Sequence, residues 1–429
     1  MSKPLLIFQA PVGSQSGYGS HSRDIARAII SMDRFDVKIV NTLWGATPNS
    51  SLNETDPRDK IIIDHFLNEP LKRKPDIYIQ NTVPNEYMAM GHYNIGITAG
   101  IETNICSREL IEGINRMNLI ITVSKHSKDV FQNTIYDKVN RATNQVEGSL
   151  SVSTPIEILF EGIDTDIFKK TNEISVVVKE TLDKIKESFV FLFVGHWLPG
   201  DLGEDRKDVG MLIKTFIHTF KKSPDKPALL LKTSGVNNSA MDRDDILRKI
   251  DRVKKEFKDD TDFPNIYLLH GDLSDSEMNS VYNHPKVKAM VSFTKGEGFG
   301  RPLLEFSVSG KPIFVSSWSG LVDFLKSEYT TFLSGKLREI HSSAVYGIYL
   351  IPGSKWFSVD YNHATNVFRD MKRNYKFYIE KAWKQKNYSR DNFSLDKMKT
   401  ELEKIFDKYL PKFSEEIPIN LPQLKKIGD

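Results

Sequence analysis

Residues 292–320 read SFTKGEGFGRPLLEFSVSGKPIFVSSWSG and combine short apolar runs with a glycine turn and two glutamates. The mostly apolar run Val287–Phe293, just before the turn, has the length of a buried strand. From Arg301 the apolar residues follow a helical spacing, and Gly310–Pro312 is a stop signal for that helix. A second strand is expected over Ile313–Ser316. The order strand, turn, helix, strand predicts one unit of a parallel α/β sheet.

The two glutamates lie eight residues apart, with Glu297 in the turn and Glu305 in the helix. The glycines Gly298 and Gly300 allow the backbone to approach a ligand closely. A helix N-terminus favours an anion, and carboxylates beside it can accept hydrogen bonds from sugar hydroxyls. These features suit a nucleotide-sugar. The alternative is that Glu305 only decorates a helix and Glu297 is a solvated turn residue, because short motifs often match by chance.

The composition bounds the class of protein. The chain has 429 residues, enough for two domains, and its net charge of +3 is not that of a dedicated nucleic-acid binder. Cys106 is the single cysteine, so no intrachain disulfide can form. The first residues lack a signal-peptide pattern and no apolar run approaches ~18 residues. We therefore expect a cytoplasmic protein without a transmembrane segment.

Strand-like runs alternate with helical stretches along the whole chain, which predicts doubly wound parallel sheets. A polar segment, 169–187, divides the chain into two such halves, and two helical pieces are expected within it. Residues 144–154 are rich in Ser, Asn and Gly and predict a mobile loop. Met371–Lys386 predicts one basic, aromatic helix on the surface, and Ser394–Leu410 predicts a helix with one apolar face.

A glycine-rich turn, Pro11–Ser20, follows the first predicted strand and precedes a helix over His21–Ile30. A dinucleotide fingerprint would need a third glycine where Ser22 stands. It would also need an acidic residue at the end of the second strand, where the sequence has Asn41. A nicotinamide site is therefore disfavoured.

Polar residues also follow other predicted strands, where ligands of parallel sheets gather. Glu102 follows the strand Tyr93–Thr98, and a helix-capping role for it is the alternative. Lys207 stands at the start of a helix, where a cation opposes the helix dipole, which favours a ligand role over a solvated lysine.

Three segments together resemble the retaining family-4 glycosyltransferases, which have the GT-B fold. They are GEGFGRPLLE (296–305), SGKP (309–312) and SWSGLVDF (317–324). Glu102-Thr103, the VSKHS segment (123–127) and EGIDTDIF (161–168) are similar to counterparts in that family. The resemblance implies two Rossmann-like domains facing a cleft. The first is expected over residues 1–170, joined by a C-terminal helix within 391–429, and the donor-binding domain over 171–390.

The resemblance also implies roles for individual residues. Glu305 would hold the ribose hydroxyls, and Glu297 with the N–H groups of the glycine turn would hold the transferred sugar. Lys207 and Arg206 would stabilise the donor diphosphate, and Glu102 would complete the catalytic group. The family usually has Arg where this chain has His196, and Arg206 is the expected substitute. The remaining donor-binding candidates are Gly298, Phe299, Gly300, Arg301, Leu304, Gly195, His196, Lys232, Gly271, Asp272, Gly17 and Gly19.

The resemblance thus implies a retaining glycosyltransferase that uses a nucleotide-diphosphate sugar, with UDP as the expected nucleotide, and needs no metal. The acceptor is either a hydroxymethylated base in DNA or a glycan. Basic clusters at 72–74, 125–128 and 372–386 could follow DNA phosphates. The alternatives are a nucleotide-sugar epimerase or phosphorylase on the same fold, or a non-catalytic sugar-nucleotide binding protein.

Overall fold

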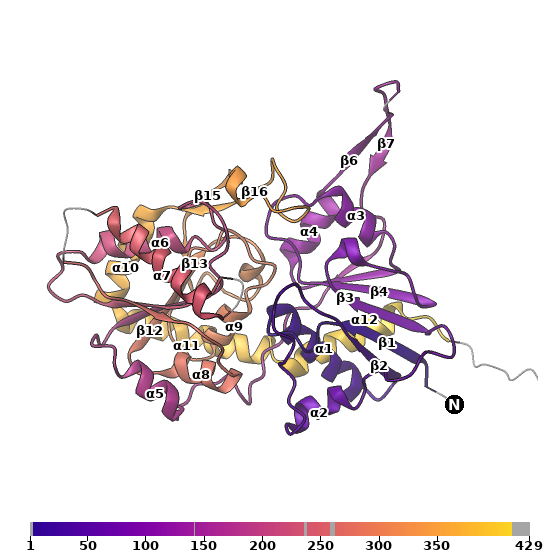
Figure 1. Ribbon diagram of the computed structural model, residues 1–429, viewed down its shortest axis with the longest axis horizontal. Helices are drawn as coiled ribbons and strands as arrows, with labels where there is room; N and C mark the ends of the chain where they lie inside the picture. The colour runs from indigo at the N-terminus through magenta and orange to yellow at the C-terminus, as the bar shows by residue number, and fades with distance from the viewer. Residues whose placement is uncertain (1–2, 141, 236–237, 258–261, 414–429) are drawn as a thin grey trace, which may run out of the picture.

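Two lobes lie side by side in the computed structural model, which describes residues 3–140, 142–235, 238–257 and 262–413 (Figure 1). Each lobe is built around one six-stranded sheet in which all neighbouring strands are parallel. Because parallel sheets are covered on both faces, their strands consist mostly of apolar residues.

In the sheet of the first lobe, the order in which the strands are added reverses next to the first strand of the chain. Its strands lie in the order β2 (Asp36–Asn41), β1 (Leu5–Ala10), β3 (Ile77–Asn81), β4 (Tyr93–Thr98), β5 (Leu119–Thr122) and β8 (Ile156–Ile158). The helices of this lobe are α1 (Gly17–Ser31), α2 (Pro57–Ile63), α3 (Arg108–Ile114), α4 (Lys125–Asn133) and the short 3-10 helix η1 (Pro84–Glu86). An antiparallel hairpin of β6 (Tyr136–Val139) and β7 (Val146–Leu150) projects from the lobe (Figure 1).

The sheet of the second lobe has the dinucleotide-type strand order, which reverses between its first and fourth strands. The strands lie in the order β11 (Ile266–Leu269), β10 (Ala228–Lys232), β9 (Val190–Val194), β12 (Val287–Ser292), β13 (Ile313–Ser316) and β14 (Thr331–Leu333). Its helices are α5 (Val176–Leu182), α6 (Val209–Phe220), α7 (Ala240–Lys255), α8 (Asp275–Asn283), α9 (Arg301–Ser307), α10 (Tyr361–Arg373) and α11 (Tyr375–Asn392). Smaller elements are the antiparallel pair β15 (Gly335–Glu339) and β16 (Lys355–Val359), with the 3-10 helices η2 (Gly320–Asp323) and η3 (Ser342–Ala344).

Alternate residues of the central strands enter two different cores. Val190 and Leu192 of β9 belong to the core beneath α5, α8 and α9. Phe191 and Phe193 belong to the core beneath α6, α7 and α10. This follows from the two-residue period of a strand, and it explains why the apolar run has no polar positions.

The chain crosses between the lobes twice, and the two crossings touch each other. Ile163, which follows β8, donates its N–H to Phe393 O at 2.8 Å, and Leu395 donates its N–H to Ile163 O at 2.9 Å. A Cβ atom on Gly162 would lie 2.9 Å from the Cα atom of Leu395, so only glycine fits there. At the other end of the lobe boundary, the N–H of Asn104 donates to Lys355 O at 2.9 Å.

After the second crossing, α12 (Leu395–Tyr409) packs on the first lobe. Its buried residues Met398, Leu402 and Phe406 share one core with strands β1 and β4. The α/β fold with two doubly wound sheets, and the C-terminal helix that returns to the first lobe, are thereby confirmed.

Four local predictions differ from the structure. Residues 144–154 contain strand β7 instead of a loop alone, and 169–187 contain the single helix α5 instead of two helical pieces. The helix predicted over 371–386 is divided at Asn374 between α10 and α11. The glycine-rich turn is shorter than predicted, because α1 already begins at Gly17.

Candidate active site

Two loops leave the second sheet where its strand order reverses. One follows β9 and leads to α6, and the other follows β12 and leads to α9. Neighbouring strands at a reversal send their connections to opposite faces, which leaves a crevice at the carboxyl ends of the strands. Lys207 lies on the first loop and Glu297 on the second, so the topology brings them together.

Glu297 lies between two cations. The Nζ atom of Lys207 donates to Glu297 Oε1, and Nη1 of Arg206 lies 3.4 Å from Oε2. Burial alone would raise the pKa of Glu297, but the charges of Lys207 and Arg206 outweigh it and hold the pKa below its usual value. The carboxylate is therefore ionised at neutral pH.

A buried ion pair beneath this group joins the two loops. Lys295 is 1% exposed, and its Nζ lies 3.3 Å from Oδ2 of Asp208, which is fully buried. Tyr361 donates its hydroxyl to the same oxygen at 2.7 Å. The N–H of Lys295 also donates to Arg206 O at 2.8 Å. These contacts fix the loop that carries Glu297 against the loop that carries the cations.

The first lobe closes over this group. Nη1 of Arg206 lies 3.5 Å from Oε1 of Glu102, so this predicted residue joins the cluster from the opposite lobe. A Cβ atom on Gly296 would lie 2.0 Å from Glu102 O, and one on Gly298 would lie 1.8 Å from Ala99 O. Any side chain at either glycine would therefore separate the lobes.

Glu305 has a different environment. It accepts hydrogen bonds from Nε of Arg301 at 2.9 Å and from the hydroxyl of Tyr282 at 3.1 Å. Nη1 of Arg301 also donates to Oδ2 of Asp24 in the first lobe at 2.6 Å. Burial raises the pKa of Glu305 to about 7 although Arg301 lowers it, and burial raises the pKa of Glu161 to about 7 in the same neighbourhood. Nη1 of Arg27 lies 3.5 Å from the other oxygen of Asp24, so two cations and three carboxyl groups meet in this part of the site.

The residues after β9 lie beside the cation pair as predicted. A Cβ atom on Gly195 would lie 3.6 Å from Cε of Lys207, so the lysine side chain runs past this glycine. His196 Nδ1 lies 3.1 Å from Ser234 Oγ. Burial and then the charges of Lys207 and Arg206 lower the pKa of His196, so the imidazole is neutral at pH 7. Arg206, not His196, supplies the second positive charge.

Three further donor-binding candidates lie together at the ends of β10 and β11. Nζ of Lys232 donates to Gly271 O at 2.6 Å, and Asp272 accepts a hydrogen bond from Asn238. Gly271 has a φ of 113°, a left-handed conformation that favours glycine, and a Cβ atom there would have no neighbour within 4 Å. Space for a ligand is thus open beside this residue.

The two N-terminal glycines lie in the first turn of α1. Ser16 caps the helix by accepting the N–H of Gly19 at 3.0 Å. A Cβ atom on Gly19 would lie 2.0 Å from Ser14 O, whereas Gly17 has no atom within 4 Å of its Cβ position. The hydroxyl of Tyr18 accepts the N–H of Ala99 at 3.0 Å, which ties this helix start to the loop that meets Gly298.

The glycine turn itself is largely buried. The side chains of Phe299 and Leu304 are 2% and 0% exposed and belong to the core of the second lobe, so only their backbone groups could contact a donor. Gly300 caps α9 with a φ of 102°, a conformation that favours glycine. The structure thus places the turn at the site but assigns these two side chains to packing.

Several residues of the site were not singled out from the sequence: Asp24, Glu161, Asp208, Tyr282 and Lys295. Lys295 had a weak signal, because it lies two residues after the mostly apolar run Val287–Phe293 and a lysine so close to a core strand is buried only when it is paired. Nothing in the sequence marked Asp24 or Tyr282 as a site residue, since each looks like an ordinary residue of an amphipathic helix. Their roles depend on contacts between distant parts of the chain.

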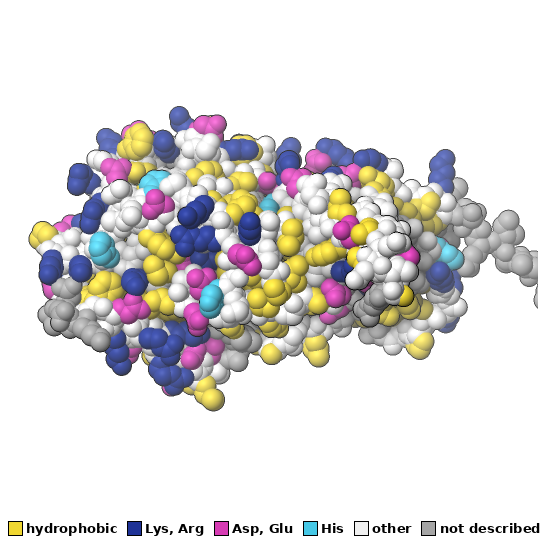
Figure 2. All heavy atoms as spheres, turned by 90° about the horizontal axis from the view of Figure 1, so that it is seen from above, with side chains coloured by type: hydrophobic (Ala, Val, Ile, Leu, Met, Phe, Trp, Pro, Cys, Tyr) yellow, Lys and Arg dark blue, Asp and Glu magenta, His cyan; other side chains and the backbone are white. Residues whose placement is uncertain are grey.

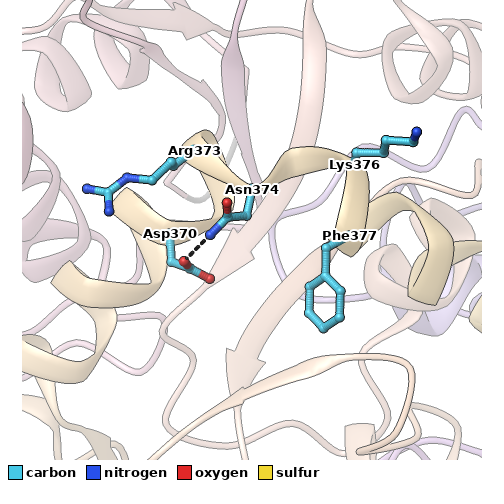
Figure 3. A pocket seen from close by; sticks show the side chains of 5 residues that line it. All are labelled: Asp370, Arg373, Asn374, Lys376 and Phe377. Atoms are coloured by element: carbon cyan, nitrogen blue, oxygen red, sulfur yellow. Dashed lines mark hydrogen bonds between the residues drawn. The ribbon is translucent and has the colours of Figure 1, made fainter.

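Other features of the described residues lie outside this site. No group of three His, Cys, Asp or Glu side chains among them is arranged to hold a metal ion, and none of their helices has the length and apolar content to cross a membrane. A surface hollow occurs where α10 meets α11 (Figure 3). It is lined by Asp370, Arg373, Asn374, Lys376 and Phe377, and contains none of the predicted site residues.

No protein-family model and no curated protein sequence matches the chain. Several solved structures are similar to the chain. Alr3699/HepE of Anabaena, in complex with UDP and glucose, is 13% identical with a TM-score of 0.59, over 94% of this chain and 100% of that chain. Sucrose-phosphate synthase of Thermosynechococcus elongatus is 11% identical with a TM-score of 0.61, over 95% and 99%. A glycosyltransferase of Rickettsia africae ESF-5 is 13% identical with a TM-score of 0.57, over 96% and 99%.

At these identities the likeness establishes the arrangement of the chain and not its chemistry. The matches extend over nearly the full length of both partners, so they include both sheets and the helix that returns to the first lobe. The chain therefore has the two-lobed GT-B fold that its sequence predicts.

Proposed function

We propose that this protein is a retaining, family-4-like glycosyltransferase that transfers a sugar from a UDP-sugar to a hydroxyl group of an acceptor. The observation that carries the proposal is the position of Glu297. It lies between Lys207 and Arg206 at the reversal of the second sheet, eight residues before Glu305, and directly beneath Glu102 of the opposite lobe. Such crevices are the usual ligand sites of open α/β sheets.

The charges of this group suit a donor diphosphate. Lys207 and Arg206 stabilise the negative charge that develops on the leaving phosphate, which is a large contribution to catalysis in a site that excludes water. Glu297 and the N–H groups of the glycine turn hold the hydroxyls of the transferred sugar. Glu305 holds the ribose, and Lys232, Gly271 and the neighbouring backbone enclose the base.

The solved structures support a UDP-sugar as the first donor to test. HepE was crystallised with UDP and glucose, and with UDP-glucose. The resemblance to retaining enzymes further implies that the leaving phosphate accepts the acceptor's proton. In that mechanism Glu102 helps to orient the reacting groups, and no metal ion is needed.

The acceptor is either a hydroxymethylated base in DNA or a glycan. Figure 2 shows Lys and Arg side chains interspersed with Asp and Glu on one face of the molecule, which is not a continuous basic track. Of the basic clusters, the one at Lys125 touches the cleft, because the N–H of Lys125 donates to Asp323 of the second lobe at 2.7 Å. Residues 72–74 precede β3, so they lie at the N-terminal ends of the strands and not at the carboxyl ends that face the cleft.

The test has two stages. Thermal shift with UDP-, GDP- and ADP-sugars should show stabilisation by a UDP-sugar, because a ligand that binds only the folded state raises its melting temperature. The stabilising donor is then incubated with hydroxymethylated DNA and with glycans, and products are identified by mass spectrometry, with the anomeric form read by NMR. Absence of any nucleotide-sugar binding would reject the proposal, an altered sugar without acceptor would indicate an epimerase, and an inverted product would reject retention.

A further inference from the structure

Arg301 lies where the two lobes meet beside Glu305. It is the first residue of α9, and its guanidinium contacts two carboxylates on different lobes. Nε lies 2.9 Å from Glu305 Oε1, and Nη1 lies 2.6 Å from Asp24 Oδ2 on α1. The side chains of Asp24 and Glu305 are 6% and 12% exposed, so solvent screens these contacts little.

The contacts leave Glu305 with a defined orientation. Arg301 binds one carboxylate oxygen, and the hydroxyl of Tyr282 binds the other at 3.1 Å. A carboxylate has about four acceptor positions, so one position on each oxygen stays available. Two such positions match the neighbouring 2′- and 3′-hydroxyls of a ribose.

Asp24 contributes to this orientation without reaching the ligand itself. A guanidinium is a planar fork, and a carboxylate on each side of the fork fixes its plane. Without Asp24, only Glu305, four residues further along the same helix, would hold the guanidinium, and one contact does not fix the plane of the fork. The second contact exists only while the lobes are together.

We propose that Arg301 is a positioning residue for the ribose: when the lobes close, Asp24 holds its guanidinium so that Glu305 presents both oxygens to the 2′- and 3′-hydroxyls. This inference rests on the proposed function. It makes recognition of a ribonucleotide, rather than a deoxyribonucleotide, depend on a residue of the opposite lobe. Asp24 therefore acts through Arg301 and Glu305, and not by contact with the donor.

The test compares UDP with 2′-deoxy-UDP by isothermal titration calorimetry on the full chain. At pH 8.5, above the pKa of about 7 of Glu305, the wild-type protein should prefer UDP by about tenfold, because a hydrogen bond to a charged group is lost with the 2′-hydroxyl. Asp24→Asn should reduce that preference to about threefold or less while 2′-deoxy-UDP binds within about twofold of its wild-type affinity. A merely structural role of Asp24 would weaken both ligands equally and leave the preference unchanged.

Asp76→Asn is the matched control. Asp76 is a half-buried aspartate of the same lobe that accepts a hydrogen bond from Arg73 at 2.9 Å. It precedes β3 and therefore lies at the N-terminal end of that strand, away from the cleft. The Asp76→Asn variant should keep the wild-type preference for UDP over 2′-deoxy-UDP. If Asp24→Asn does not fold, as judged by circular dichroism, Arg301→Lys decides, because a lysine lacks the fork and should lose the preference as well.

The outcomes separate the two proposals. Wild-type protein that binds neither nucleotide would overturn the proposed function. Wild-type protein that prefers UDP, with the same preference in Asp24→Asn and Arg301→Lys, would overturn only the positioning role of Arg301.

Discussion

Glu297 and Glu305 belong to one motif, yet their surroundings are opposite. Glu297 contacts Lys207 and Arg206, and their charges hold its pKa below the usual value. Glu305 contacts the cation Arg301, which also contacts Asp24, and burial raises the pKa of Glu305 to about 7. Eight residues of chain thus separate a carboxylate that two cations keep ionised from a carboxyl group whose pKa burial raises to about 7.

The difference matches the two ends of a nucleotide-sugar. A diphosphate is anionic and requires cations that its own charge can neutralise. A ribose is neutral and requires acceptors for its hydroxyls, which carboxyl groups provide. In the proposed function Lys207 and Arg206 face the diphosphate, Glu297 faces the sugar beside it and Glu305 faces the ribose, so substitutions at the two glutamates should have different consequences.

Substitution of Lys207 should have the largest effect. Lys207→Met removes a cation from the position where the leaving phosphate gains charge, so turnover of UDP-glucose should fall by about 10²–10³-fold. The measurement is the rate of donor consumption at saturating UDP-glucose. Lys214→Met is the control, because Lys214 lies on α6 and pairs with Glu256 at the surface. A loss below about tenfold in Lys207→Met would contradict the proposed role.

Substitution of Glu161 should change stability as a function of pH. The pKa of Glu161 is raised from an ordinary 4.5 to about 7, so the folded state binds its proton more tightly than the unfolded state. The stabilisation by this proton is complete below about pH 4.5 and is lost as the pH rises through about 7. Glu161→Gln removes this loss, which amounts to about 3 kcal/mol at most, at 1.36 kcal/mol per pKa unit.

Denaturant unfolding at pH 5 and pH 8 measures the effect. The wild-type free energy of unfolding should fall more between these values than that of Glu161→Gln. Glu157→Gln serves as the control, since contacts with Lys408 and Tyr409 outweigh burial and place the pKa of Glu157 below its usual value. An equal pH dependence in wild type and Glu161→Gln would show that burial does not raise the pKa of Glu161 in the folded protein.

The smallest effect should distinguish the two glutamates directly. Glu305→Gln should weaken UDP and UDP-glucose by the same factor, about tenfold, because both carry the ribose. Glu297→Gln should not weaken UDP, because it removes a negative charge beside the cations that hold the diphosphate, and it should weaken UDP-glucose relative to UDP by a similar factor, since Glu297 faces the sugar. Calorimetry with both ligands measures this, with the surface variant Glu256→Gln as reference. If both variants lost the same affinity for UDP and the same affinity for UDP-glucose, the two glutamates would not face different parts of the donor.

The sequence predicted the parts of the site that lie close together in the chain. Glu297, the glycine turn and Glu305 form one local motif, and the position of Lys207 followed from the same resemblance. Alternating strands and helices predicted the two parallel sheets. These features depend on neighbouring residues and on the periodicity of apolar side chains, which are visible without coordinates.

The contacts between the lobes could not be predicted. Asp24 and Arg301 are 277 positions apart, and their pairing depends on how closely the lobes approach. Strand β7 was missed because its residues are exposed and carry no apolar alternation. The break at Asn374 was missed because neither glycine nor proline marks it.

The contact between the two crossings has a mechanical consequence. Gly162 packs against Leu395, so both covalent links between the lobes pass through one point (Figure 1). Bodies joined in this way can swing about that pivot but cannot slide apart, as in hinged proteins. Asn104 and Lys355 form a further contact between the lobes, in which the N–H of Asn104 donates to Lys355 O at 2.9 Å and the N–H of Lys355 donates to Asn104 Oδ1 at 2.6 Å. A swing about the pivot would have to break these two hydrogen bonds, so they hold the lobes together away from the covalent links.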